Sequence, residues 1–220
     1  MTSKKTRLLL SLYQNKLFLV IETGFLILFP LFLLQFKPEL LYLRKLVMLF
    51  SLLYIWFVMK TQEISLRRIG LTTKNLVDSF KPLFIVIILV AISVALFISF
   101  NLHSHFLFIE QVANETQYKP LFVILLGTLL SAFLQEIIFR GYYISRLELI
   151  SKNRFFLTLW PTIIFSLIHI PFNNITLVIF TFILGVIYAN NFLKYRNLIS
   201  LIISHAILIA ILLLQMSLIW

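Results

Sequence analysis

Residues 121–141 read LFVILLGTLLSAFLQEIIFRG, an apolar run that carries Gln135, Glu136 and Arg140 near its end. A helix needs about 20 apolar residues to cross a bilayer, so this run is long enough to span one. An ionised side chain near the bilayer centre costs about 2.5–3.5 kcal/mol, and such residues usually pair with each other and mark a site. Glu136 and Arg140 stand four residues apart, so the spacing predicts that they pair on one helix face.

The composition of the whole chain points to a membrane protein. Of its 220 residues, 61% are hydrophobic and only 12% are charged, which is far from the composition of soluble domains. We expect an all-α, polytopic bundle that forms one integral membrane domain over residues 1–220, with a cytoplasmic N-terminus. The basic segment before the first span has no small-residue cleavage signature, which predicts a retained anchor. Seven transmembrane helices are expected, near residues 17–35, 40–59, 82–101, 121–149, 155–170, 174–192 and 197–218.

The net charge of +11 is spread over loops and does not form one patch. With this topology, fifteen of the nineteen basic residues, Arg140 and Arg146 among them, belong to cytoplasmic segments. The other four basic residues are expected on the opposite side of the membrane: Lys37, Arg44, Lys45 and Lys119. This asymmetry follows the positive-inside rule, so we expect the lipid bilayer, and no nucleic acid, as the partner of this charge. Abundant Ile, Leu, Phe, Lys and Asn suit an AT-rich bacterium, and the plasma membrane is the expected location.

Two connections between the expected helices contain many polar residues. Residues 60–81 mix basic and aliphatic side chains, which suits either the membrane surface or a solvated loop. Residues 101–119 hold His103, His105, Glu110 and Glu115, whose spacing matches no common metal-ligand pattern. We assign these four residues no role.

Catalytic chemistry in this chain must come from carboxylate, imidazole and amide groups. The absence of cysteine excludes disulfides, cysteine nucleophiles and zinc-thiolate sites. Gly-rich phosphate loops and HExxH or GxSxG strings are also absent. Three places in the second half remain as candidates: Gln135 to Arg140, then Phe165-x-x-x-His169 with Asn173 one turn later, and His205 in the last span.

Helix geometry indicates whether these places can meet. If the helix that begins at 121 continues to about Leu149, Glu136 and His169 each lie sixteen residues from the turn at 152–153. Both would then lie about 24 Å from that turn on antiparallel helices. His205 lies only about 12 Å into its helix, so a tilt or an earlier helix start near Asn191 is needed. A buried ion pair alone serves the fold as readily as a function, but two added histidines predict a site.

The order of these residues resembles the CAAX protease and bacteriocin-processing family of intramembrane endopeptidases, also called the Abi family. Its pattern is Glu-Glu-x-x-x-Arg, then Phe-x-x-x-His, then a final His-x-x-x-Asn, each on a membrane helix. The resemblance covers about residues 121–210 of this chain, and Gly141 fits it as well. It implies hydrolysis of a membrane-associated peptide or protein substrate by water that a glutamate and a histidine activate.

Carried onto this chain, the resemblance implies a role for each matching residue. His169 would orient or deprotonate the water, and His205 would donate to the oxyanion. Glu136 and Arg140 would hold the helix face in place, and Asn173 would support the site. No cofactor is implied. Zinc held by Glu136, His169 and His205 is an alternative that the expected pairing of Glu136 with Arg140 disfavours.

Two positions depart from the family pattern. Gln135 stands where the first glutamate belongs, and Ile209 stands where the asparagine after His205 belongs. An amide cannot take a proton from water, and loss of a general base typically costs about 10²- to 10⁴-fold in rate. Loss of an oxyanion donor costs about 10²- to 10³-fold. Glu136 is rotated by about 100° from position 135, so it replaces that base poorly unless the helix is distorted.

Two functions therefore remain open. The first is an intramembrane endopeptidase that is impaired by Gln135 and Ile209. The second is a catalytically inactive pseudo-protease that acts as a membrane scaffold, sensor or bacteriocin self-immunity protein. Gln135 itself has three explanations: natural loss of activity, slow catalysis through His169, or a substitution introduced to trap substrate. A transporter is disfavoured because no internal repeat is evident.

Overall fold

The computed structural model describes residues 15–24, 43–62, 64–100, 121–172 and 174–216. Every regular element in this part of the chain is a helix, which confirms the all-α expectation. The segment 101–119 lies outside the described residues. The expected N-terminal anchor, residues 1–16, also lies outside them, except for Asn15 and Lys16. The elements are α2 Lys16–Thr23, α4 Arg44–Thr61, α5 Leu76–Ser99, α7 Leu121–Glu136, the π-helix η4 Ile137–Ile144, α8 Ser145–Leu147, α9 Arg154–Leu167, the 3₁₀-helix η5 Ile170–Phe172, α10 Ile175–Tyr195 and α11 Leu198–Met216.

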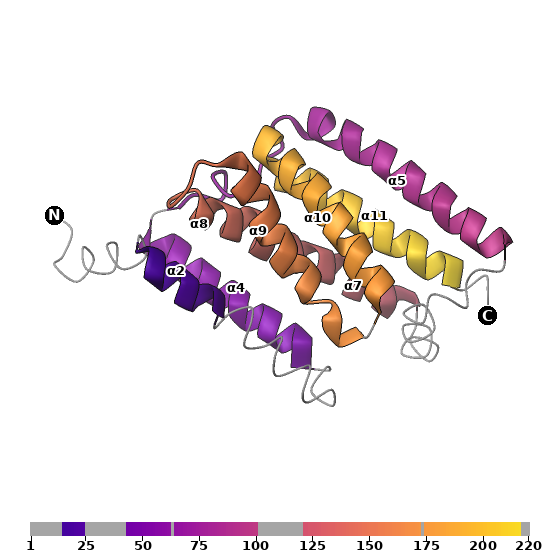
Figure 1. Ribbon diagram of the computed structural model, residues 1–220, viewed down its shortest axis with the longest axis horizontal. Helices are drawn as coiled ribbons and strands as arrows, with labels where there is room; N and C mark the ends of the chain where they lie inside the picture. The colour runs from indigo at the N-terminus through magenta and orange to yellow at the C-terminus, as the bar shows by residue number, and fades with distance from the viewer. Residues whose placement is uncertain (1–14, 25–42, 63, 101–120, 173, 217–220) are drawn as a thin grey trace.

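The π-helix η4 joins α7 to α8, which are labelled in Figure 1, and packs against α4, α9, α10 and α11. α11 packs against α5 and α7, and α9 packs against α10. One hydrophobic core joins α2, α4 and α9 and includes Phe139 and Tyr142 of η4. A second core joins α5, α10 and α11 and includes Ile137 and Ile144 of η4. Because all eight residues of η4 are buried, this short segment connects the two cores.

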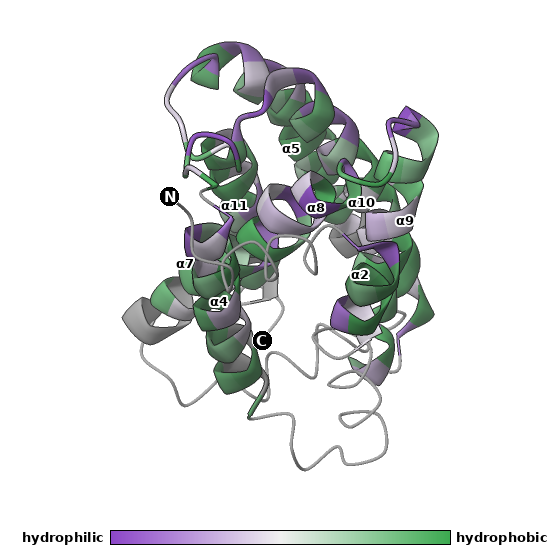
Figure 2. Cartoon of the chain, turned by 90° about the vertical axis from the view of Figure 1, so that its left-hand side faces the viewer, coloured by the Kyte–Doolittle hydropathy of each residue, from purple (hydrophilic) through white to green (hydrophobic). Residues whose placement is uncertain are grey.

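The outer surface of the bundle has the character of a membrane protein. Large apolar side chains such as Trp56, Ile85 and Phe155 are 60–72% exposed, and Figure 2 shows hydrophobic residues along most of the helical surface. Within the described residues, three helical segments are long and apolar enough to cross a bilayer: Leu76–Leu96, Arg154–Phe172 and Ile175–Tyr195. Shorter apolar helices cover Leu49–Thr61 and Leu198–Leu213. The total of seven spans stays a prediction.

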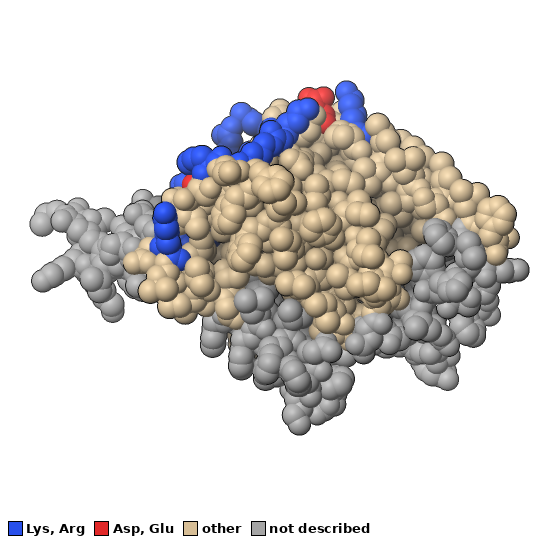
Figure 3. All heavy atoms as spheres, viewed as in Figure 1, with Lys and Arg blue, Asp and Glu red and all other residues tan. Residues whose placement is uncertain are grey.

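Basic side chains gather at one end of the bundle (Figure 3). The start of α5, the start of α9 and the end of α10 meet there and carry Lys81, Arg154 and Lys194. This arrangement is what the positive-inside rule requires, although the side of the membrane stays a prediction. Arg140 and Arg146, which were counted with the cytoplasmic segments, are each 2% exposed and lie in buried ion pairs, so they add no charge to the surface of the bundle.

Several helix boundaries differ from the sequence prediction, and three of them have a physical explanation. The chain expected to form one helix over 121–149 is helical without a break as far as Leu147, but its α-helix ends at Glu136, where the π-helix η4 begins. The helix expected at 155–170 ends at Leu167, because Pro171 lacks an N–H and restricts the residue before it. The helix expected from 82 begins at Leu76, with Asp78 in its first turn, where a carboxylate is favoured by the helix dipole.

The connection after α4 is docked onto the helices. Ile69 is 2% exposed, and the Gly70 carbonyl accepts a hydrogen bond of 2.7 Å from the Leu198 N–H at the start of α11. The Asn197 side-chain amide donates to the carbonyls of Thr72 and Lys74. A Cβ added to Gly141 would lie 3.1 Å from Leu198 and 3.2 Å from the Ile69 carbonyl. Gly141 therefore lets this connection and α11 approach the π-helix closely.

A close approach of α9 to α10 at Gly185 leads to a first prediction. A Cβ at Gly185 would lie 2.7 Å from the Thr162 methyl carbon, and small residues commonly allow such contacts between membrane helices. We expect Gly185→Ala to lower the free energy of unfolding by about 1–3 kcal/mol through overpacking. Unfolding in detergent measures the change. Gly24→Ala is the control, since a Cβ there meets no atom of the described residues within 4 Å. Equal stability of the two variants would contradict the prediction.

Candidate active site

Glu136 and Arg140 form the predicted ion pair inside the bundle. Glu136 is the last residue of α7 and is 0% exposed, and Arg140 lies in η4. Arg140 Nη1 lies 3.3 Å from Glu136 Oε1. The guanidinium also lies 4.0 Å from the centre of the Phe165 ring and 5.7 Å from that of Tyr188. These aromatic faces favour a desolvated cation, so the charge of Arg140 is compensated from three helices.

His205 of α11 joins the same carboxylate. Its Nδ1 lies 2.8 Å from Glu136 Oε1, and its ring is close to the rings of Phe165 and Tyr188. The mismatch in depth expected for His205 is absent. The reason is that the wider turns of a π-helix advance less along the axis and that α8 ends already at Leu147. Glu136 consequently lies nearer to the basic end of the bundle than a straight helix to 149 would place it.

His169 is the second histidine that contacts the Phe165 ring. It occupies the turn between α9 and η5, and its Nδ1 lies 2.9 Å from the Phe165 carbonyl oxygen. The ring centre of Phe165 lies 5.1 Å from that of His169 and 6.4 Å from that of His205. Phe165 thus contacts both imidazoles and the guanidinium of Arg140. The structure brings Glu136, Arg140 and His205 into direct contact, and Phe165 links His169 to them.

The partners of the two histidines assign their tautomers. A carbonyl oxygen can only accept a hydrogen bond, so the proton of neutral His169 is on Nδ1. The Glu136 carboxylate, paired with Arg140, likewise accepts from Nδ1 of His205. In both neutral rings the basic lone pair is therefore on Nε2. Each imidazole is oriented by its Nδ1 bond and carries acid or base chemistry at Nε2.

Gln135 and Glu136 each have one buried side-chain oxygen atom that accepts no hydrogen bond from the described residues. Gln135 Nε2 donates to Ser131 Oγ over 2.9 Å, while Gln135 Oε1 and Glu136 Oε2 are buried without a hydrogen bond. Buried acceptors are nearly always satisfied in folded proteins. Water molecules and peptide N–H groups are donors that fit two such acceptors at neighbouring positions of one helix.

Two further positions complete the comparison with the sequence prediction. Asn173 lies outside the described residues, so its supporting role stays a prediction. Ile209 lies one turn beyond His205 on α11 and offers no polar atom. Within the described part of the chain, no three His, Cys, Asp or Glu side chains are grouped to hold a metal ion. That finding applies to Glu136, His169 and His205, the three ligands of the zinc alternative.

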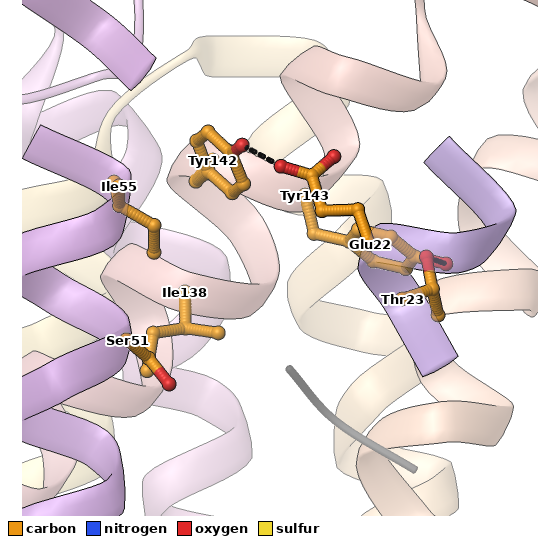
Figure 4. Close-up of a pocket in the computed structure, with 7 residues that line it drawn as sticks. All are labelled: Glu22, Thr23, Ser51, Ile55, Ile138, Tyr142 and Tyr143. Atoms are coloured by element: carbon orange, nitrogen blue, oxygen red, sulfur yellow. Dashed lines mark hydrogen bonds between the residues drawn. The ribbon is translucent and has the colours of Figure 1, made fainter. Parts of the chain in front are cut away.

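A second buried polar cluster was missed by the sequence analysis. Glu22 of α2 contacts Tyr142 of η4 and Arg146 of α8. Glu22 and Tyr142 line a small cavity (Figure 4). Glu22 lies inside the first apolar run, at residues 17–35, and an intramembrane carboxylate is a candidate for a special role by its position alone. The position of Glu22 within this apolar run could have identified it from the sequence.

The comparisons with known proteins agree with the resemblance seen in the sequence. Residues 117–211 match the family model of the type II CAAX prenyl endopeptidase Rce1-like proteins. Comparison with curated proteins and with solved structures gave no match. The matched region contains every residue of the candidate site, from Gln135 to His205. Over residues 117–211 the chain is therefore similar to the type II CAAX prenyl endopeptidase Rce1-like family.

Proposed function

We propose that this protein is an intramembrane endopeptidase that hydrolyses a peptide bond in a membrane-associated peptide or protein. The observation that carries the proposal is the hydrogen bond of 2.8 Å between Glu136 and His205 in the interior of an apolar bundle. His169 approaches the same place across Phe165. The bacterial plasma membrane is the proposed location, which cell fractionation can test.

The proposed reaction needs one base and one oxyanion donor. His169 Nε2 takes a proton from water as the water oxygen attacks the carbonyl carbon of the substrate. His205, protonated at both nitrogens during catalysis, donates from Nε2 to the oxygen that becomes negative. The proton held by His169 then passes to the leaving amine nitrogen as the C–N bond breaks. No metal ion or cofactor takes part in this sequence.

The charges around Glu136 support this division of roles. Glu136 accepts a hydrogen bond from Nδ1 of His205, as a buried carboxylate does beside a catalytic histidine. Arg140, at 3.3 Å from the same oxygen, adds a second positive charge. With His205 protonated, these three groups carry one net positive charge in a site of low dielectric constant. Such a fixed charge stabilises an oxyanion more than water does.

The proposed rate of peptide hydrolysis is low because Gln135 replaces a carboxylate base. Its amide oxygen accepts a hydrogen bond from the attacking water and orients it, but cannot remove its proton. His169 therefore acts as the base without the help of a second carboxylate. The lack of a polar atom at Ile209 leaves His205 as the proposed oxyanion donor.

A cleavage assay in liposomes tests the proposal. The substrates are a panel of leader peptides and prenylated peptides that associate with the bilayer, and cleavage is followed by mass spectrometry. We expect slow cleavage, its loss in His169→Ala, and a decrease of about 10²- to 10³-fold in His205→Ala.

The control for this assay is His103→Ala, the same substitution at a histidine to which the sequence assigns no role. We expect it to cleave like the unaltered protein. Cleavage that His169→Ala leaves unchanged would show that the site is assigned wrongly.

The alternative is a pseudo-protease that holds a partner helix or peptide without cutting it. The observation in its favour is the amide at position 135, beside the buried acceptor atoms of the site. In that case the same peptides bind to the protein in liposomes and stay intact. His169→Ala would then leave their affinity unchanged, which separates this function from slow cleavage.

A further inference from the structure

Glu22 is a buried carboxylate whose oxygens are all engaged by protein groups. Its Oε2 lies 3.1 Å from Arg146 Nη2 and 3.4 Å from Arg146 Nε. Its Oε1 accepts a hydrogen bond of 2.8 Å from the Tyr54 hydroxyl and a second one from the Tyr142 hydroxyl. Glu22 therefore connects α2 with α4, η4 and α8, and has no oxygen left for a ligand.

The contacts of Glu22 concentrate on the segment that carries the candidate site. Tyr142 belongs to η4, and Arg146 lies in α8 directly after it. Figure 4 shows Glu22 reaching from α2 to the Tyr142 hydroxyl. The adjacent Thr23 hydroxyl donates to the Tyr143 hydroxyl over 3.0 Å. One turn of α2 thus contacts two successive residues of the π-helix.

The π-helix needs an external reason for its shape. π-helices are rare and occur mostly as single distorted turns, often at functional sites. In this chain η4 is flanked by an ion pair at each end, Glu136 with Arg140 and Glu22 with Arg146. The wider turn sets the direction of Arg140 relative to Glu136. A change in the turn would therefore alter the position of the carboxylate that orients His205.

We infer that Glu22 is a positioning residue, which holds η4 in its π-helical form and so keeps Glu136 and Arg140 in place against His205. Its effect on catalysis rests on the proposed function, whereas its effect on η4 does not. α2 lies outside residues 117–211, the region that matches the family. The inference therefore assigns to the N-terminal part of the chain a role in shaping the site.

Two tyrosines provide a matched test. Tyr142→Phe and Tyr54→Phe each remove one phenol hydroxyl that donates to the same oxygen, Oε1 of Glu22. Only Tyr142 belongs to the π-helix. The readout is amide hydrogen exchange of the full chain in detergent, with peptides from 137–147 compared with peptides from α10.

We expect Tyr142→Phe to accelerate exchange over 137–147 by about tenfold, because a hydrogen bond to a charged group is lost. Tyr54→Phe should leave that region unchanged. Glu22→Gln should accelerate exchange there by about 100-fold, since Arg146 loses its ionic partner. α10 should exchange as in the unaltered protein.

The outcomes separate positioning from general stabilisation. Equal exchange in Tyr142→Phe and Tyr54→Phe would overturn the inference. Faster exchange over both 137–147 and α10 would also overturn it, because Glu22 would then hold only the fold. If Glu22→Gln does not fold, the two tyrosine variants still decide the result.

A kinetic measurement adds a readout that depends on the proposed function. If the protein cleaves peptides, Tyr142→Phe should lower kcat by about tenfold and leave KM unchanged, because the displaced groups act in the transition state. An unchanged kcat together with faster local exchange would overturn the link to catalysis. A protein that cleaves nothing but shows the expected local exchange would contradict the proposed function and leave the role of Glu22 in η4 intact.

Discussion

Replacing Gln135 with glutamate is expected to raise the rate of peptide cleavage by about 10²- to 10⁴-fold, the usual contribution of a general base. A carboxylate at 135 can accept a hydrogen bond from the Ser131 hydroxyl, to which the amide now donates. Its second oxygen would take the place of the buried Gln135 Oε1 and could remove a proton from water. Initial cleavage rates in liposomes measure the gain.

The gain should depend on the rest of the site. His169→Ala in the Gln135→Glu background is expected to abolish cleavage. Gln62→Glu, the same substitution at the end of α4 and outside the site, is the control and should cleave like the unaltered protein. If Gln135→Glu cleaves no peptide of the panel, the pseudo-protease function is favoured over the slow enzyme.

Replacing Arg140 with methionine is expected to lower the free energy of unfolding by about 3–5 kcal/mol, the usual cost of removing one partner of a buried ion pair. Methionine keeps most of the apolar length of the side chain, so the main loss is the charge. The Glu136 carboxylate would remain 0% exposed with His205 as its other partner. Unfolding of the purified protein in detergent measures the change.

The double variant Glu136→Gln with Arg140→Met is the control for this second experiment. It removes both charges, and replacing a whole buried pair by neutral groups is often tolerated. We expect it to recover most of the stability that Arg140→Met loses. If the double variant is as unstable as the single one, packing of the guanidinium on Phe165 and Tyr188 accounts for the loss instead of charge.

Features that depend on local spacing were accessible from the sequence. The i,i+4 spacing of Glu136 and Arg140 predicted their pairing because a helical turn brings such residues to one face. The order of Glu136, His169 and His205 also predicted the resemblance to CAAX proteases, and residues 117–211 match the Rce1-like family model. The catalytic roles of these residues stay predictions until the variants are measured.

Features that depend on packing were not accessible in the same way. Nothing in IIFRGYYI distinguishes a π-helix from an α-helix, so the continuous helix to 149 was the natural expectation. That expectation placed His205 at the wrong depth. Glu22 was missed because its partners Tyr142 and Arg146 lie about 120 residues away in the chain, and no periodicity connects residues at that separation.

The sequence by itself determined that this protein is a helical membrane bundle with a buried carboxylate, guanidinium and imidazole set, because composition and helical spacing act locally. Only the tertiary structure decided that His205 joins the pair of Glu136 and Arg140. The bond between Glu136 and His205 joins α7 to α11, directly before the π-helix η4 begins. The shape of that π-helix is supported by contacts from both cores and from Glu22, which are long-range interactions.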